Sequence, residues 1–209
     1  MRKVGMYSTW LIAAGLIATA LAAEPHSPDD PKKVTPLAVG AHAPAFSVRE
    51  ANGKPFNFTP SKLIKPALLI FYRGGWCPYC NAHLKELRVV EPKLVALGYD
   101  VLFLSTDRPE ILHSSLKEDV GYRLLSDNEV HAARAFGIAF RMDNKTYEEY
   151  KTYGLDLEAS QGAKHHELPV PAVFIVDRKG IVRFAHANAD YTVRLDAAEL
   201  SAAAEAALR

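Results

Sequence analysis

The sequence contains little cysteine, almost no excess charge and few long apolar runs. Its 209 residues include two cysteines, Cys77 and Cys80, which leaves any zinc site at this pair short of ligands. Basic and acidic residues nearly balance, 25 against 24, and no basic block occurs, so we expect no nucleic acid partner and no anionic membrane partner. Beyond the N-terminus no segment approaches 18 apolar residues, so we expect no membrane partner for the mature chain.

The N-terminus has the pattern of a secretory signal. Arg2 and Lys3 precede an apolar stretch over residues 10–21, which ends in the small-residue sequence Ala20-Leu21-Ala22. We therefore predict a cleavable signal over residues 1–22 and a location in a periplasm or outside the cell, with a retained N-terminal anchor as the alternative. The polar, proline-rich residues 23–37 predict a flexible linker, and residues 38–209 predict one domain.

Apolar runs along that domain alternate between strand and helix patterns. Residues 67–72 and 101–105 predict buried strands, and leucines at helical spacing predict a helix over residues 82–97 that Pro92 should bend or interrupt. Further helices are predicted over residues 110–118, 130–136 and 197–208, a short strand over 122–125, and a β-hairpin over 172–185. This alternation predicts an α/β fold with a parallel sheet and helices on both faces.

The two cysteines stand in Trp76-Cys77-Pro78-Tyr79-Cys80, directly after the first predicted strand. A thiol at a helix N-terminus has a lowered pKa, because unpaired backbone N–H groups and the helix dipole favour the thiolate. We therefore assign nucleophilic attack to Cys77 and resolution, by formation of an internal disulfide, to Cys80. The alternatives are a structural disulfide and a metal site that adds His83, whereas covalent haem attachment is excluded because residue 81 is Asn.

A strand that leads into a Cys-x-x-Cys helix, with a terminal hairpin and helix, resembles the thioredoxin-like fold, a central mixed sheet flanked by helices. The closer resemblance is to the peroxiredoxin-like branch of the AhpC/TSA family. It rests on the opening segment around Gly40, Ala43-Pro44 and Phe46, on Phe71-Tyr72-Arg73-Gly74-Gly75-Trp76-Cys77-Pro78-Tyr79-Cys80-Asn81, on residues 168–177, and on Asp190-Tyr191 with Arg194. The resemblance implies a thiol-based antioxidant that needs no cofactor or metal and is reduced by a thioredoxin-like or other external thiol.

The resemblance and the residues together nominate further site positions. Typical peroxiredoxins have Pro and Thr or Ser where this chain has Ile70 and Gly74, so we assign to Arg73 the stabilisation of the thiolate and of the developing oxyanion; a surface charge is the alternative. Pro171 is similar to the cis-proline of thioredoxins, which implies that the Val170 backbone docks a substrate cysteine. Trp76 is expected to shield the thiols beside the substrate.

The sequence leaves more than one interpretation for Asp107 and for residues 140–167. Asp107 follows the second predicted strand and fits either a helix cap or a ligand contact. An apparent insertion over residues 140–167 carries Tyr147, Tyr150 and Tyr153, which fit core packing, a lid or substrate contact.

Three functions are consistent with the sequence. The first is a peroxidase in which Cys77 attacks a peroxide, and the second is a periplasmic thiol:disulfide oxidoreductase in which it attacks a protein disulfide. The third is a copper- or zinc-binding module using Cys77, Cys80 and His83.

Overall fold

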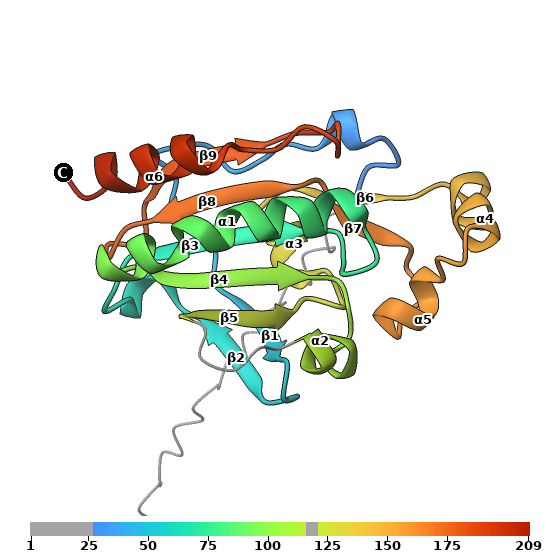
Figure 1. The fold of residues 1–209 in the computed structure, drawn as a ribbon. Coiled ribbons are helices and arrows are strands. Elements are labelled where there is room, and N and C mark those ends of the chain that lie inside the picture. Colours follow the sequence, from blue (N-terminus) through green and yellow to red (C-terminus); the bar gives the residue numbers. More distant parts are fainter. Residues whose placement is uncertain (1–26, 116–120) are drawn as a thin grey trace, which may run out of the picture.

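A computed structural model describes residues 27–115 and 121–209 of the chain. Seven strands in these residues form one sheet in the order β2-β1-β5-β4-β3-β8-β9 (Figure 1). Their bounds are β1 Phe46–Glu50, β2 Pro55–Phe58, β3 Ala67–Tyr72, β4 Asp100–Ser105, β5 Tyr122–Ser126, β8 Ala172–Val176 and β9 Val182–Ala187. Strands β3, β4 and β5 are parallel, and the outer strands pair antiparallel. The predicted mixed α/β sheet is confirmed, with its parallel part limited to three strands.

Helices cover both faces of this sheet. Helices α1 (Pro78–Ala96) and α6 (Ala197–Ala206) lie on one face, and α3 (His131–Ala135) packs on the other (Figure 1). A second, two-stranded sheet of β6 (Ala139–Arg141) and β7 (Glu167–Pro169) flanks the helices α4 (Asn144–Thr152) and α5 (Leu157–Gln161). The remaining short elements are α2 (Pro109–Ser115), η1 (Pro31–Lys33) and η2 (Pro60–Lys62). None of the helices in the described ranges is long and apolar enough to cross a membrane.

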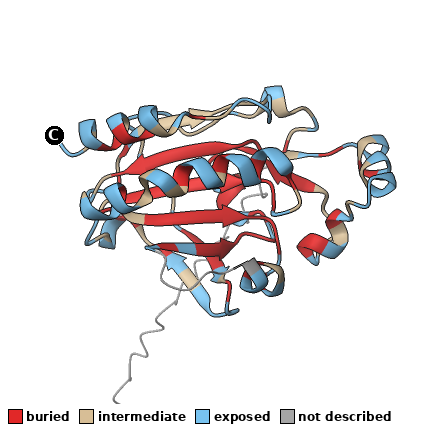
Figure 2. Ribbon diagram, viewed as in Figure 1, coloured by how far each residue is buried: buried red, intermediate tan, exposed pale blue. Residues whose placement is uncertain are grey.

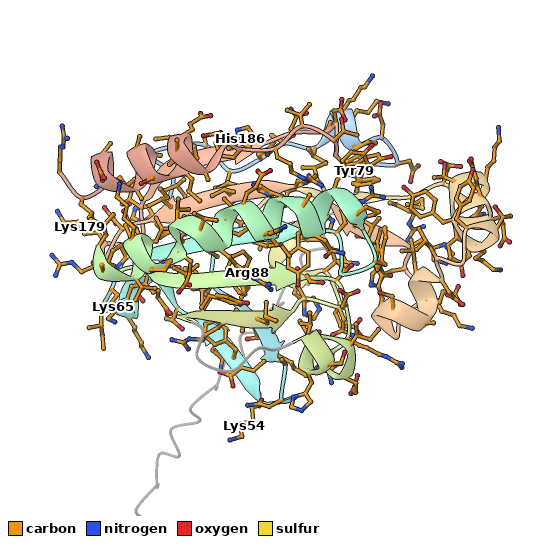
Figure 3. All side chains as sticks on the ribbon, in the orientation of Figure 1. Lys54, Lys65, Tyr79, Arg88, Lys179 and His186 are labelled. Atoms are coloured by element: carbon orange, nitrogen blue, oxygen red, sulfur yellow. The ribbon has the colours of Figure 1, made fainter. Side chains whose placement is uncertain are left out.

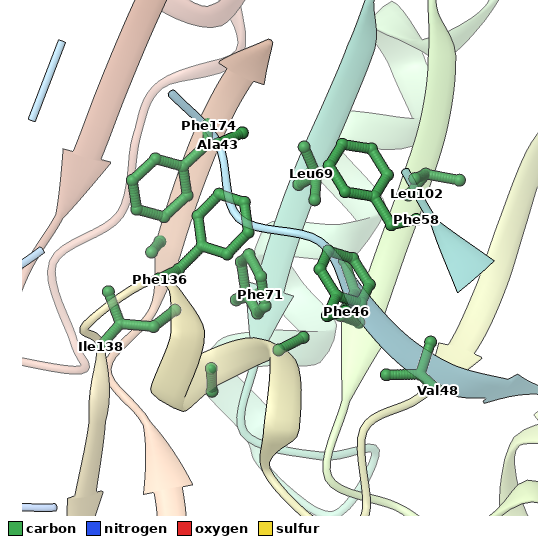
Figure 4. Close-up of a cluster of buried hydrophobic side chains, with 14 of the residues drawn as sticks. Ala43, Phe46, Val48, Phe58, Leu69, Phe71, Leu102, Phe136, Ile138 and Phe174 are labelled. Atoms are coloured by element: carbon green, nitrogen blue, oxygen red, sulfur yellow. The ribbon is translucent and has the colours of Figure 1, made fainter. Parts of the chain in front are cut away.

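The core is split into two clusters by the side-chain alternation of β3. Ala67, Leu69 and Phe71 point to the α3 face, whereas Leu68, Ile70 and Tyr72 point to the α1 face. On the α3 face, aromatic rings interlock, with Phe136 and Phe174 centroids 4.9 Å apart (Figure 4). The central strands are buried on both faces, while the outer surfaces of the helices remain exposed (Figure 2).

Helix α1 starts at the cysteine motif, as the motif predicted, but its bounds and its middle differ from the helix that leucine spacing predicted over residues 82–97. It begins at Pro78, because Cys77 acts as the N-cap and proline is well suited to the first helical position. It also continues through Pro92 to Ala96 without a break. Pro92 is exposed, so solvent can satisfy the backbone carbonyl that loses its hydrogen bond there.

Residues 27–37, which were predicted to belong to a flexible linker, run along the domain instead. Ser27 Oγ donates to Glu167 Oε2 at 2.5 Å, the N–H of Arg141 donates to the Pro28 carbonyl, and Leu37 N–H donates to the Phe136 carbonyl. Leu37 is partly buried against the core. The predicted signal and the start of the linker, residues 1–26, and the end of the helix predicted over 110–118 lie outside the described residues.

Candidate functional site

The cysteine pair lies where β3 ends and α1 begins, as predicted. Cys77 is the N-cap of α1, and its Sγ accepts a hydrogen bond from the Cys80 N–H at 3.4 Å. Both side chains are free thiols, and both are buried, with 2% and 1% of their surface exposed. The first turn of the helix thus brings the two sulfur atoms to one place in the apolar cluster under α1.

The electrostatics of the pair favour one negative charge, on Cys77. The Cys80 thiol hydrogen-bonds the Cys77 sulfur and so lowers the pKa of Cys77, and the Cys80 N–H and the charges of Arg73 and Arg194 lower it further. These effects outweigh burial, which raises the pKa, and the pKa of Cys77 falls from 9.0 to about 6. The same hydrogen bond, together with burial, raises the pKa of Cys80 far above its ordinary value. Near neutral pH the arrangement therefore holds Cys77 as a thiolate and Cys80 as a thiol.

Arg73 is buried beside the thiols and is not a surface charge, since only 3% of it is exposed. Its guanidinium carbon lies 4.4 Å from the ring centre of Tyr191 and 5.2 Å from that of Trp76. Nη2 donates to the Tyr150 hydroxyl at 2.8 Å, whereas Nε is buried and has no hydrogen-bond partner in the part of the chain that the structure describes. No carboxylate within the described ranges pairs with it, so its charge acts on the cysteines.

The end of β4 holds the turn that carries Arg73. Thr106 Oγ1 donates to the Arg73 carbonyl at 2.8 Å, and the Gly75 N–H donates to Oδ2 of Asp107 at 2.7 Å. Ser105 Oγ and Ser160 Oγ also donate to the Asp107 carboxylate, which is 1% exposed. Asp107 is therefore neither the exposed ligand contact nor the helix cap that the sequence suggested, because its oxygens serve the turn before the cysteines.

Gly74 is required by this turn. Its φ of +156° is rarely adopted by residues with a side chain, and a Cβ there would lie 2.9 Å from Oδ1 of Asp107 and against the indole of Trp76. Gly75 has ordinary space, with its nearest contact at 3.7 Å. Gly74 stands where typical peroxiredoxins have Thr or Ser, and because it has no side chain, Trp76 and Asp107 can occupy the space beside the thiols.

The three tyrosines of the insertion have three different roles. Tyr147 is a core residue that stacks on His166 with ring centres 3.9 Å apart. Tyr150 reaches the site, where it accepts the hydrogen bond from Arg73 and contacts the Trp76 ring edge-on. Tyr153 is exposed and donates to Glu149. Helical spacing alone could not separate these roles, because they depend on how α4 meets the turn after β3.

A cavity of about 190 Å³ opens beside Arg73. Val170 and Pro171, which the sequence assigned to substrate contact, line it. Aromatic and apolar residues form most of its remaining wall: Pro31, Phe140, Met142, Tyr150, Pro169, Ala189 and Tyr191. Trp76 does not line this cavity; it packs between the thiols and the insertion, which agrees with a shielding role. Tyr79, at the start of α1 (Figure 3), is half exposed, and its ring lies 5.6 Å from Tyr191.

The thioredoxin-like role expected for Pro171 is wrong. The described residues contain no cis peptide bond, so Val170 and Pro171 are joined by a trans bond. The Val170 N–H donates to the Ile138 carbonyl at 2.9 Å, which leaves it unable to hydrogen-bond a substrate backbone. The Ile138 carbonyl, directly before β6, thus occupies the donor that substrate docking would need.

The metal-binding alternative receives no support from the geometry. The buried ring of His83 contacts the Leu195 carbonyl through Nε2 at 3.0 Å, and burial lowers the pKa of His83 to about 4. Among the residues that the structure describes, no three His, Cys, Asp or Glu side chains are grouped so that they could hold a metal ion.

Arg194 is a site residue that the sequence marked only through the family resemblance. It lies in the loop between β9 and α6, and its Nη2 donates to Cys80 Sγ at 3.4 Å. Local sequence spacing could not have revealed this contact, because Arg194 and Cys80 are 114 residues apart in the chain.

Comparison with known proteins agrees with this geometry. Residues 39–185 match the model of the AhpC/TSA family. The chain is 34% identical over 106 residues to peroxiredoxin Bcp of Escherichia coli strain K12, which covers 50% of this chain and 67% of the relative. A peroxiredoxin-like protein from Aquifex aeolicus has the same fold, with a TM-score of 0.64 at 17% identity over 83% of this chain and 89% of that one. Peroxidoxin BcpB from Mycobacterium tuberculosis gives a TM-score of 0.59 at 17% identity, over 82% and 97% of the two chains. A redox-type cysteine pair at the start of α1 and a family match over most of the domain lead to one conclusion: the chain belongs to the AhpC/TSA family.

Proposed function

We propose that this protein is a thiol-dependent peroxidase in which Cys77 attacks a peroxide and Cys80 resolves the product. The observation that carries the proposal is the position of Cys77, which caps the N-terminus of α1, accepts the Cys80 N–H at 3.4 Å and lies beside the buried Arg73. This environment lowers the pKa of Cys77. A thiolate is the reactive form of cysteine, and an adjacent guanidinium stabilises charge that develops on the departing oxygen.

The reaction has two chemical steps on the protein. The Cys77 thiolate attacks one peroxide oxygen, so the S–O bond forms, the O–O bond breaks, and the departing alkoxide or hydroxide takes a proton. Cys80 then attacks the Cys77 sulfenic acid, which forms the Cys77–Cys80 disulfide and releases hydroxide that is protonated to water. An external dithiol, supplied by a thioredoxin-like or other thiol reductant, returns the pair to two thiols and becomes a disulfide itself.

The test is the second-order rate constant of the reduced protein with hydrogen peroxide, followed by the fluorescence of Trp76. We expect a rate far above that of a free thiol, lost in Cys77→Ser, and a trapped sulfenic acid in Cys80→Ser. A rate equal to that of a free thiol would remove the peroxidase proposal. Fast exchange with a protein disulfide in the same preparation would then favour the thiol:disulfide oxidoreductase, against which the engaged Val170 N–H already argues.

The N-terminal sequence supports a periplasmic or secreted location, where a peroxidase of this kind needs a dedicated reductant. Cell fractionation of the full chain, with N-terminal sequencing of the product, tests it. A product that begins near Ala23 supports cleavage, one that keeps Met1 in the membrane fraction supports an anchor, and one in the cytosol overturns the location.

A further inference from the structure

Arg194 is a partly buried arginine with an unusual set of contacts, because nitrogen atoms of its guanidinium are themselves buried. Its Nη2 donates to Cys80 Sγ at 3.4 Å, while Nε and Nη1 are buried without a hydrogen-bond partner among residues 27–115 and 121–209. No ion pair within the described residues engages its guanidinium, and the nearby Asp190 carboxylate accepts hydrogen bonds from Thr192. Buried donors without partners are costly, so a partner that carries charge during part of the reaction would account for them.

The charge on the cysteine pair must change place during the proposed reaction. In the reduced protein, Cys80 keeps its proton because the hydrogen bond to Cys77 and burial both raise its pKa. Once Cys77 becomes an uncharged sulfenic acid, the thiolate that held this proton no longer exists. The influences that then favour a Cys80 thiolate are the Arg73 backbone and the guanidinium of Arg194.

We infer that Arg194 is a catalytic residue of the second step, whose guanidinium stabilises the Cys80 thiolate as Cys80 attacks the sulfenic acid of Cys77. This inference rests on the proposed function, because resolution follows attack on a peroxide. In the step, Cys80 loses its proton to water, its sulfur bonds to the Cys77 sulfur, and the S–O electron pair leaves with hydroxide. The Cys80 sulfur is oxidised and the Cys77 sulfur is reduced. Arg194 keeps its proton throughout, since a guanidinium is not deprotonated in proteins.

Other titratable groups near Cys77 and Cys80 could also change the charge state of Cys80, so their effect must be distinguished from that of Arg194. Those that face Cys80 or Arg194 come from β3 and its turn, α1, β9 and the loop before α6: Tyr72, Arg73, Cys77, His83, His186 and Asp190. Burial keeps His83 neutral above about pH 4 and raises the pKa of Tyr72, so neither competes near neutral pH. His186→Asn serves as the control for the remaining imidazole.

The first experiment measures the pKa of Cys80 alone, by thiolate absorbance in the Cys77→Ser background. We expect Arg194→Gln to raise that pKa by about one unit or more, and Arg194→Lys to restore part of the shift because it returns the positive charge. Arg178→Gln, which removes an exposed arginine at the hairpin turn, should leave the pKa unchanged. A Cys80 pKa that does not respond to Arg194→Gln overturns the inference, whatever the peroxide rate.

The second experiment follows the peroxide-independent phase of Trp76 fluorescence in the protein with both cysteines. Arg194→Gln should slow this phase about tenfold at neutral pH, more than it slows the peroxide-dependent phase, and should increase sulfinic acid at Cys77 under excess peroxide. Arg194→Lys should recover part of the rate. An unchanged second phase overturns the role in resolution. If the unaltered protein reacts no faster than a free thiol but the Cys80 pKa still responds, the peroxidase proposal fails and Arg194 acts on the same thiolate in disulfide exchange.

Discussion

The Gly75 N–H donates to Oδ2 of Asp107 at 2.7 Å, and this bond ties the end of β4 to the turn that carries Arg73 and Cys77. Because Asp107 also accepts hydrogen bonds from Ser105 and Ser160, one buried carboxylate connects three segments: the turn after β3, the end of β4, and α5. Positioning of this kind is what a reactive thiolate requires, since small displacements at a reaction centre cost much of the rate.

The first prediction concerns this carboxylate. Asp107→Asn replaces one acceptor oxygen by an NH₂ group, so at least one of its three donors, two of them the buried hydroxyls of Ser105 and Ser160, loses its partner. We expect a loss of about 1–3 kcal/mol in the free energy of unfolding, measured in urea, and a slower reaction of Cys77 with peroxide. Asp100→Asn, which weakens the partly exposed pair with Arg123, is the control and should change both quantities little. Equal effects of the two changes would contradict the role given to Asp107.

The second prediction separates the two glycines of the turn. Gly74→Ala puts a Cβ 2.7 Å from Cδ1 of Trp76 and strains the backbone, so the turn must shift. We expect the peroxide rate constant to fall about tenfold or more. Gly75→Ala meets only an ordinary contact with Asp107 and should react nearly as the unaltered protein does. If Gly75→Ala were the more damaging change, the turn would not have the geometry described.

The third prediction is the pH dependence of the first step. The pKa of Cys77 is lowered to about 6, so the peroxide rate constant should rise with pH through about 6 and level off above pH 7. Because this folded-state pKa lies below the ordinary thiol value of 9.0, the stability it gives the reduced protein is fully present above pH 9. That stability is lost as pH falls through about 6. The profile is measured by stopped flow between pH 4 and 9.

Matched changes at Cys80 identify the cause of the lowered pKa. Cys80→Ala removes the side-chain donor to the Cys77 thiolate and should move the rate profile to higher pH. Cys80→Ser keeps a donor at that position and should move it less. Identical profiles for the two variants would show that the Cys80 side chain does not hold the Cys77 thiolate.

The fourth prediction tests the contact between the insertion and Arg73. Tyr150→Phe leaves a buried guanidinium N–H without its acceptor, so we expect a loss of about 1–3 kcal/mol in stability and a several-fold slower peroxide reaction. Tyr153→Phe loses only an exposed bond to Glu149 and should stay within about 0.5 kcal/mol of the unaltered protein. A neutral Tyr150→Phe would mean that Arg73 is held by its ring contacts alone.

Local sequence patterns predicted most of the sheet and the start of the site. The apolar run Ala67–Tyr72 and the cysteine spacing identified β3 and the N-terminus of α1, because periodicity and helix capping are properties of neighbouring residues. Pro171 was misassigned because the peptide geometry and the pairing of Val170 with Ile138 depend on the insertion folding back against the strand.

The sequence alone could not predict which residues from distant parts of the chain contact each other. Asp107 could be interpreted only as a cap or a ligand contact, since nothing next to it marks Gly75 and Ser160 as its partners. Arg194 entered through resemblance alone, because its contact with Cys80 forms only when the loop before α6 packs on α1.

The insertion has a consequence for the order in which the protein assembles. Two of its hydrogen bonds to the site, from Arg73 to Tyr150 and from Ser160 to Asp107, close intervals of 77 and 53 residues. Closing such intervals costs chain entropy, so we expect these bonds to form late, after the local pairing of β3, β4 and β5. The contribution of Arg73 to the thiolate environment of Cys77 would then be complete only in the finished protein. A newly made chain would pass through its sheet-forming stages with its cysteines less reactive toward peroxide, and so less exposed to irreversible oxidation before it can be reduced.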